Sequence, residues 1–198
     1  MDHSEARYAI QDGAREIDVV LPLGLLLSNP PQYTCLFNHL KTIVDAAAPV
    51  PVKVILETCL IPTQALKTAA SIISAESGAA FVKTSTGFAR GGATKEDISL
   101  MYKAVKYKGN VKVKASGGIR SFEACQEMFR AGAERIGTCV NTVIIFMTFC
   151  INISRFLGHL VLRSCRVVVR INSSRITHKC FQGSWWDGIR GASTQHFR

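Results

Sequence analysis

The sequence predicts an α/β fold, a partial (β/α)8 TIM barrel of about five strand–helix units that occupies residues 1–139. Short β-branched runs alternate regularly with amphipathic helical segments over this range. Such repeats imply parallel strands joined by crossover helices. Polar residues recur at the strand ends, at Asp18, Glu57, Lys83 and Lys114. This favours a barrel, whose chemistry gathers at the carboxyl ends of several strands, over an open doubly wound sheet.

The strands are predicted from runs rich in Val, Ile and Phe. They cover residues 15–20 (REIDVV), 52–58 (VKVILET), 79–85 (AAFVKTS), 111–116 (VKVKAS) and 134–138 (ERIGT). A short helix that ends near Gly13 precedes the first strand. The crossover helices are predicted at residues 35–47, 62–78, 94–105 and 121–132, where apolar residues recur at helical spacing.

Residues 140–198 form a second segment of different character, predicted to be an irregular basic tail. They hold eight Lys or Arg residues against one acid, Asp187, and so carry much of the net charge of +10. Arg163, Arg166 and Arg170 with the pair Trp185–Trp186 would suit nucleic acid or anionic lipid. The first 139 residues are nearly balanced in charge, so the basic net charge is weak evidence for nucleic-acid binding by the main domain. For residues 140–198 we favour a tail without a binding function. We therefore expect no nucleic-acid partner.

The same tail argues against a membrane span and a metal site. Its apolar stretch is interrupted by Asn141, Asn152, Arg155 and His159, whereas a span needs ~18 or more nearly uncharged residues. Its cysteines and histidines do not match a zinc spacing. Seven cysteines without a C-x-x-C pair, and an amino terminus without a signal-peptide core, predict a reduced cytoplasmic protein.

Lys83 and Lys114 are the residues that most strongly suggest chemistry. They lie one strand–helix unit apart, so their strands are neighbours at a spacing of about 4.8 Å. If both face the barrel interior, like charge and burial disfavour protonation, and at least one amine titrates low. A neutral amine attacks carbonyls and forms a Schiff base. The alternative is that both lysines extend from the strand ends to water.

Further polar and glycine positions surround this pair. Asp18 is a strand carboxylate that could pair with an ammonium and relay protons, or form an ordinary ion pair. Gly117 and Gly118 follow the Lys114 strand and could let backbone N–H groups approach an anion. Gly137 lies in a similar small turn at the next strand.

Four collinear segments, "DGAREIDVV", "VKVILETCLIP", "FVKTSTGFARGGAT" and "VKVKASGGIRSFEACQEMFRAGAERIGT", resemble the deoxyribose-phosphate aldolase family of class I aldolases. The resemblance covers about the first 138 residues. It implies a metal-free, cofactor-free TIM barrel that reversibly cleaves 2-deoxy-D-ribose 5-phosphate to glyceraldehyde 3-phosphate and acetaldehyde, in deoxyribonucleotide catabolism.

The resemblance also implies roles for single residues. Lys83 matches the Schiff-base lysine, Lys114 the lysine that lowers its pKa and aids proton transfer, and Asp18 the proton-relay aspartate. The substrate and phosphate positions are Thr86, Gly87, Gly117, Gly118 and Gly137. The implied partner is a small sugar phosphate.

The chain departs from the family pattern at both ends. Family members begin with about three more units, so the five here match family strands 4 to 8. Cys139 stands where the family has a phosphate-binding serine, and Pro22 where it favours a polar residue. These departures suggest an incomplete gene model, which the transcript would test. They keep an inactive fragment open as the alternative, and an unclosed sheet with open edges makes a homo-oligomer a further expectation.

Overall fold

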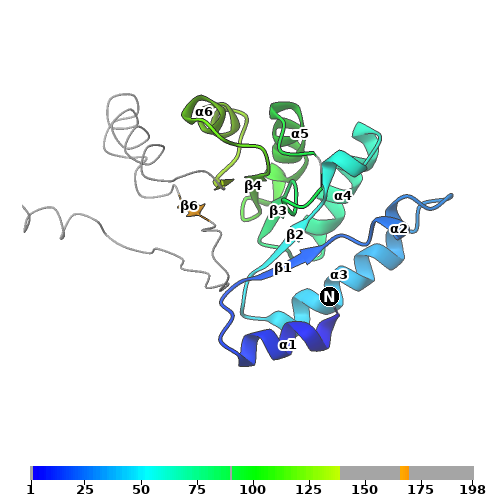
Figure 1. Cartoon of the computed structure of the whole chain (residues 1–198). Coiled ribbons are helices and arrows are strands. Elements are labelled where there is room, and N and C mark those ends of the chain that lie inside the picture. The colour runs from blue at the N-terminus through cyan, green and yellow to red at the C-terminus, as the bar shows by residue number, and fades with distance from the viewer. Residues whose placement is uncertain (1, 90, 139–165, 170–198) are drawn as a thin grey trace, which may run out of the picture.

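The computed structural model describes residues 2–89, 91–138 and 166–169. Its centre is a parallel sheet whose strands follow one another in chain order, β1-β2-β3-β4-β5-β6 (Figure 1). The strands are β1 (Ile17–Val20), β2 (Val52–Ile55), β3 (Phe81–Lys83), β4 (Lys112–Ser116), β5 (Arg135–Thr138) and β6 (Arg166–Val169). A doubly wound sheet would reverse its strand order at a switch point, and this order does not reverse. The winding is therefore that of a barrel wall.

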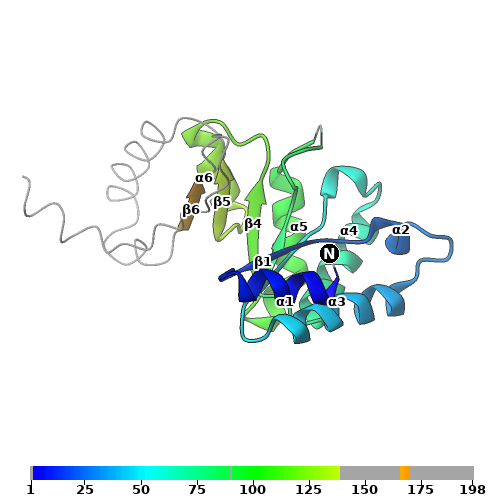
Figure 2. The same cartoon turned by 60° about the horizontal axis from the view of Figure 1, so that its bottom comes forward.

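Helices connect the strands and cover one face of the sheet (Figures 1 and 2). They are α1 (His3–Gln11), α2 (Leu23–Leu26), α3 (Tyr33–Ala47), α4 (Gln64–Glu76), α5 (Lys95–Val105) and α6 (Phe122–Arg130), with short 3-10 turns η1 (Thr58–Leu60) and η2 (Lys106–Lys108). Within the described residues, no helix has the length and apolar character needed to cross a membrane.

Short polar residues start the crossover helices. The hydroxyls of Thr63, Thr94 and Ser121 each accept a backbone N–H three residues along, at 3.2, 3.1 and 3.1 Å. This satisfies one of the free N–H groups at the beginning of α4, α5 and α6. Each of these helices thus begins at a position fixed by its own sequence.

The core lies between the sheet and these helices. Val54, Val82 and Val113 are in register across β2, β3 and β4, and none is measurably exposed. They belong to one apolar cluster with residues of α3 and α5 such as Leu40 and Met101. Because side chains alternate along a strand, the intervening residues point to the opposite face. That opposite face carries the polar residues.

Besides the short turns η1 and η2, the structure adds one helix and one strand that the sequence analysis did not predict. Helix α2 follows Pro22, and β6 lies within the segment expected to be irregular. Strand β6 pairs with β5 from Arg135↔Arg166 to Thr138↔Val169. The strand consists of Arg166 and three consecutive valines, and such a β-branched run is a strand signal. The rest of residues 139–198 lies outside the described residues, so the predicted domain boundary stays a prediction.

Candidate active site

Four basic side chains lie buried on the polar face of the sheet. Lys53 is 1% exposed, Lys83 8%, Lys114 7% and Arg135 6%. Lys83 of β3 pairs in register with Lys114 of β4, which pairs in turn with Arg135 of β5. Buried cations are rare in proteins unless counter-charges compensate them. The carboxylates of β1 and the segment before it supply that compensation.

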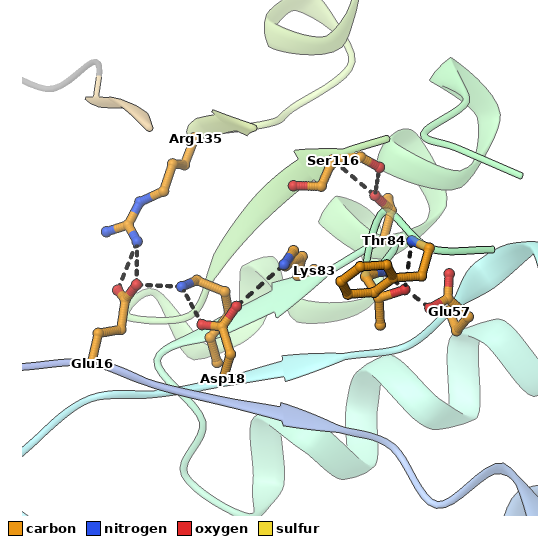
Figure 3. Close-up of polar contacts among 10 residues, drawn as sticks. Glu16, Asp18, Glu57, Lys83, Thr84, Ser116 and Arg135 are labelled. Carbon is orange, nitrogen blue, oxygen red and sulfur yellow. Dashed lines mark hydrogen bonds and ion pairs between the residues drawn. The ribbon is translucent and has the colours of Figure 1, made fainter. Parts of the chain in front are cut away.

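Asp18 connects two of the lysines. Its Oδ1 accepts a hydrogen bond from Lys53 Nζ at 2.7 Å, and its Oδ2 accepts one from Lys83 Nζ at 3.2 Å (Figure 3). Each carboxylate oxygen thus has its own ammonium partner. The two contacts fix the carboxylate beside Lys83, where a proton can pass between them through the ion pair or a bound water.

Glu16 continues this chain of charges. Its carboxylate accepts a hydrogen bond from Lys53 and two from Arg135 Nη1, at 2.8 and 2.6 Å. The Arg135 guanidinium also lies 4.0 Å from the centroid of the Phe81 ring, and Lys53 Nζ lies 5.6 Å from it. Stacking and paired hydrogen bonds of this kind hold a guanidinium in one orientation. An ordered row of charges therefore runs from Arg135 through Glu16, Lys53 and Asp18 to Lys83.

The clustered cations perturb the titration of the site. Burial, and then the charges of Lys53 and Lys83, lower the pKa of Lys114 to about 7, although Asp18 opposes the shift. Burial raises the pKa of the Asp18 carboxyl, but Lys53, Lys83 and Lys114 together outweigh it and bring that pKa below its ordinary value. A large share of Lys114 is therefore a neutral amine near neutral pH, beside an ionised Asp18.

The loops beyond the lysine strands pack closely on one another. A Cβ on Gly92 would lie 2.5 Å from the carbonyl oxygen of Gly117, so only glycine allows this approach. Gly117 and Gly118 have φ of 91° and 73°, which favours glycine. Ser85 lies against Gly117, and its buried hydroxyl has no hydrogen-bond partner in the part of the chain described. The backbone of Gly117 and Gly118 and the unpaired Ser85 hydroxyl thus lie together, just beyond the strands that carry Lys114 and Lys83.

The remaining predicted positions lie at the same end of the sheet. Gly87, with φ of 98°, follows Thr86 in the loop after β3. Gly137 of β5 is in register with Ser116 of β4, and a Cβ there would lie 2.3 Å from Ser116 Oγ and 3.5 Å from Lys114 Cε. The glycine therefore leaves room beside Lys114.

Sequence reasoning missed Lys53, Glu16 and Arg135. A period-two pattern would have indicated Glu16, because it lies two residues before Asp18 in a predicted strand. Its partners Lys53 and Arg135 also lie in predicted strands, but the sequence alone does not pair them with Glu16. Among the described residues no cluster of three or more His, Cys, Asp or Glu could hold a metal ion. Metal-free chemistry remains a prediction.

Comparison with known proteins identifies the family. The family model described as DeoC/LacD family aldolase matches residues 1–174. This chain belongs to the DeoC/LacD aldolase family. The match extends past residue 139, into the segment predicted to be an unrelated tail. The fold expected from the resemblance is confirmed for the described strands and helices.

The individual relatives carry the name deoxyribose-phosphate aldolase. The one from Macrococcus caseolyticus is 47% identical over 141 residues, 71% of this chain and 62% of the relative. The one from Brevibacillus brevis is 47% identical over 142 residues, 72% of this chain and 62% of the relative. A solved structure, the tetrameric deoxyribose phosphate aldolase from Aeropyrum pernix, superposes with a TM-score of 0.59 at 34% identity. The superposition covers 68% of this chain and 55% of the Aeropyrum pernix chain. The chain thus spans less than two thirds of the length of these relatives.

Proposed function

We propose that this family member reversibly cleaves 2-deoxy-D-ribose 5-phosphate to glyceraldehyde 3-phosphate and acetaldehyde through a Schiff base on Lys83. The observation that carries the proposal is the register of Lys83 with Lys114, both buried, with Asp18 bonded to Lys83. The names of the relatives supply the substrate. Imine formation needs an amine nucleophile, and Lys114, whose pKa is lowered to about 7, lies opposite Lys83, where it can take up a proton during the reaction.

The bond changes follow from the products. The Lys83 amine adds to the C1 aldehyde of the open-chain sugar, and loss of water gives the imine. A base then removes the C3 hydroxyl proton, the C2–C3 bond breaks, and its electron pair forms an enamine on C2 while C3 becomes an aldehyde. Protonation of C2 and hydrolysis release acetaldehyde and regenerate the amine. The two carbons of acetaldehyde require cleavage between C2 and C3.

Lys114 and Asp18 are assigned the proton transfers. Lys114 has a pKa of about 7, so it can accept a proton near neutral pH and return it later. Asp18 bonds Lys83 and lowers the cost of the cationic imine that forms there. Both roles need the ordered contacts to Lys53 and Glu16, which keep Asp18 in place.

The glycine turns are assigned the phosphate. Gly117 and Gly118 adopt left-handed conformations, in which their backbone N–H groups can point toward an anion. The loop of Thr86 and Gly87 follows the neighbouring strand β3. Cys139, at the family's serine position, lies outside the described residues. We propose a sugar phosphate as the partner, a cytoplasmic location and no metal or cofactor.

The alternative is a chain that keeps the family fold without its activity. The match spans 62% of the length of the Macrococcus caseolyticus relative, and β1 pairs with β2 alone among the described strands. A free strand edge favours pairing with a second copy, so we also propose a homo-oligomer, as in the tetrameric relative.

Acetaldehyde release from deoxyribose 5-phosphate tests the proposal against this alternative. A coupled alcohol dehydrogenase assay on purified full-length protein would measure it, together with a thermal melt by circular dichroism. A cooperative melt with release that disappears in K83R supports the enzyme. A cooperative melt without release supports the inactive alternative.

A further inference from the structure

Glu57 is the only non-glycine residue with a positive φ among the described residues, with φ 55° and ψ 58°. It lies just after β2, next to the lysine strand, and is 4% exposed. A side chain in this left-handed conformation costs free energy that its surroundings must offset, and such residues gather at functional sites. Glutamate is neither the residue that this conformation favours nor one usually found buried. Its contacts explain why it stands here.

The left-handed residue shifts the strand pairing by one position. Leu56 N donates to the carbonyl of Lys83 at 2.8 Å, and Thr58 N donates to the carbonyl of Thr84 at 3.0 Å. From Leu56 to Thr58 the chain after β2 advances by two residues, while its partner advances by only one, from Lys83 to Thr84. This is the pattern of a β-bulge. A bulge re-aims the side chain that lies within it, which here is Glu57. The irregularity lies directly beside the residue that follows Lys83.

The re-aimed carboxylate binds the loop after Lys83. Glu57 Oε2 accepts a hydrogen bond from Thr86 N at 3.1 Å (Figure 3). Its Oε1 accepts one from the Cys59 thiol at 3.8 Å. The Thr86 hydroxyl in turn accepts a hydrogen bond from Phe88 N at 3.2 Å. A carboxylate that accepts a backbone N–H forms one of the stronger hydrogen bonds in proteins. Glu57 thus ties the turn of residues 86–88 to the end of β2.

On the other side, Thr84 ties the same segment to β4. Its hydroxyl donates to the carbonyl of Ser116 at 2.8 Å and accepts Ser116 N at 2.9 Å. Thr84 N also donates to the carbonyl of Lys114 at 3.2 Å. Residue 84 is therefore fixed through β4, whereas Glu57 holds Thr86 through the Thr86 amide.

We infer that Glu57 is a positioning residue that holds the loop of Thr86 and Gly87 over Lys83, and with it the sugar-phosphate end of the substrate. Glu57 acts through the Thr86 amide, and its contacts are with the loop. The catalytic consequence rests on the proposed aldolase function, whereas the loop contact itself can be measured without it. A small aldehyde that lacks phosphate makes no use of the loop.

Three variants separate the carboxylate from the backbone conformation. E57Q keeps an acceptor for Thr86 N, E57A loses it and keeps the left-handed strain, and E57G loses it but adopts the left-handed conformation freely. E57G therefore melts above E57A. A merely structural role predicts that function follows melting temperature, so that E57G functions better than E57A. A positioning role predicts that both lose function alike and that E57Q keeps it.

Hydrogen exchange of the full-length protein tests the loop contact directly. The Thr86 amide exchanges ~10-fold or more faster in E57A and E57G than in the wild type, and within ~3-fold of the wild type in E57Q. Borohydride trapping adds the catalytic readout. Trapping of deoxyribose 5-phosphate falls ~10-fold or more in E57A and E57G, because misplacement of a binding loop disturbs reactive geometry, while trapping of acetaldehyde changes less than ~3-fold.

Two results would overturn the inference. One is equal exchange of the Thr86 amide in all four proteins, and the other is trapping that follows melting temperature. If the wild type trapped neither aldehyde, the proposed function would fail, while the exchange comparison would still decide the role of Glu57.

Discussion

Lys83 and Lys114 lie directly opposite each other in adjacent parallel strands, and each is less than a tenth exposed. Two ammonium groups in this position repel each other and lose hydration, and the low pKa of Lys114 expresses that cost. Asp18 compensates on the Lys83 side through its hydrogen bond. The repulsion between the two ammonium groups therefore destabilises the fold, and it also favours a neutral amine at Lys114.

Removing the Lys114 amine should stabilise the fold. Its folded pKa of about 7 lies below the ordinary value of 10.5, so the unfolded chain binds more protons between these two pH values. The penalty is complete below about pH 7 and fades as the pH rises toward 10.5. K114M should therefore raise the unfolding free energy by about 1–3 kcal/mol at pH 6, and by less at pH 9, in urea titrations.

Lys112 offers the matched control, because it lies on the same strand with a side chain that is 47% exposed. K112M should change the unfolding free energy by less than ~0.5 kcal/mol at either pH. Equal destabilisation by K114M at pH 6 and pH 9 would show that Lys114 is not strained by its charge.

Substitutions of Asp18 and Lys53 should shift the pKa of Lys114 in opposite directions. Asp18 stabilises the protonated amine, so D18N lowers the pKa of Lys114 further. Lys53 is the first of the charges that lower it, so K53M raises that pKa. NMR titration of labelled lysine side chains would measure both. Shifts of the same sign in D18N and K53M would contradict the assigned electrostatics.

The close approach of the two glycine loops should be sensitive to a single methyl group. A Cβ on Gly92 would meet backbone atoms of Gly117 and Gly118 at 2.5 to 3.1 Å, and backbone cannot yield as a flexible side chain can. G92A should cost ~1–3 kcal/mol of unfolding free energy, as overpacking does. Gly24 has nothing within 4 Å of its Cβ position, so G24A is the control and should be nearly neutral. A neutral G92A would mean that the loops are not packed together.

Much of the fold was predictable from the sequence, because each strand is bracketed by an amphipathic helix with a start signal. Lys83 and Lys114 were predictable as neighbours, since they occupy equivalent places in consecutive units. Lys53 was harder to recognise because all four residues of β2 are buried, so the strand shows no alternation of exposure.

Other features depend on contacts that sequence patterns do not contain. The left-handed Glu57 has no glycine signal, and only the shifted pairing of Leu56 and Thr58 reveals it. The pairing of Glu16 with Arg135 joins residues 119 positions apart and depends on how the sheet curves. Pairing of β6 with β5 depends likewise on tertiary structure.

The identity of the reacting amine is the central claim, and borohydride trapping tests it most directly. Full-length protein is incubated with deoxyribose 5-phosphate, reduced with borohydride, digested and mapped by mass spectrometry. K83R is the control, because arginine keeps the charge and forms no such imine. The account predicts a reduced adduct on Lys83 that is absent from K83R. An adduct on Lys53 or Lys114 in place of Lys83, or no adduct at all, would contradict it.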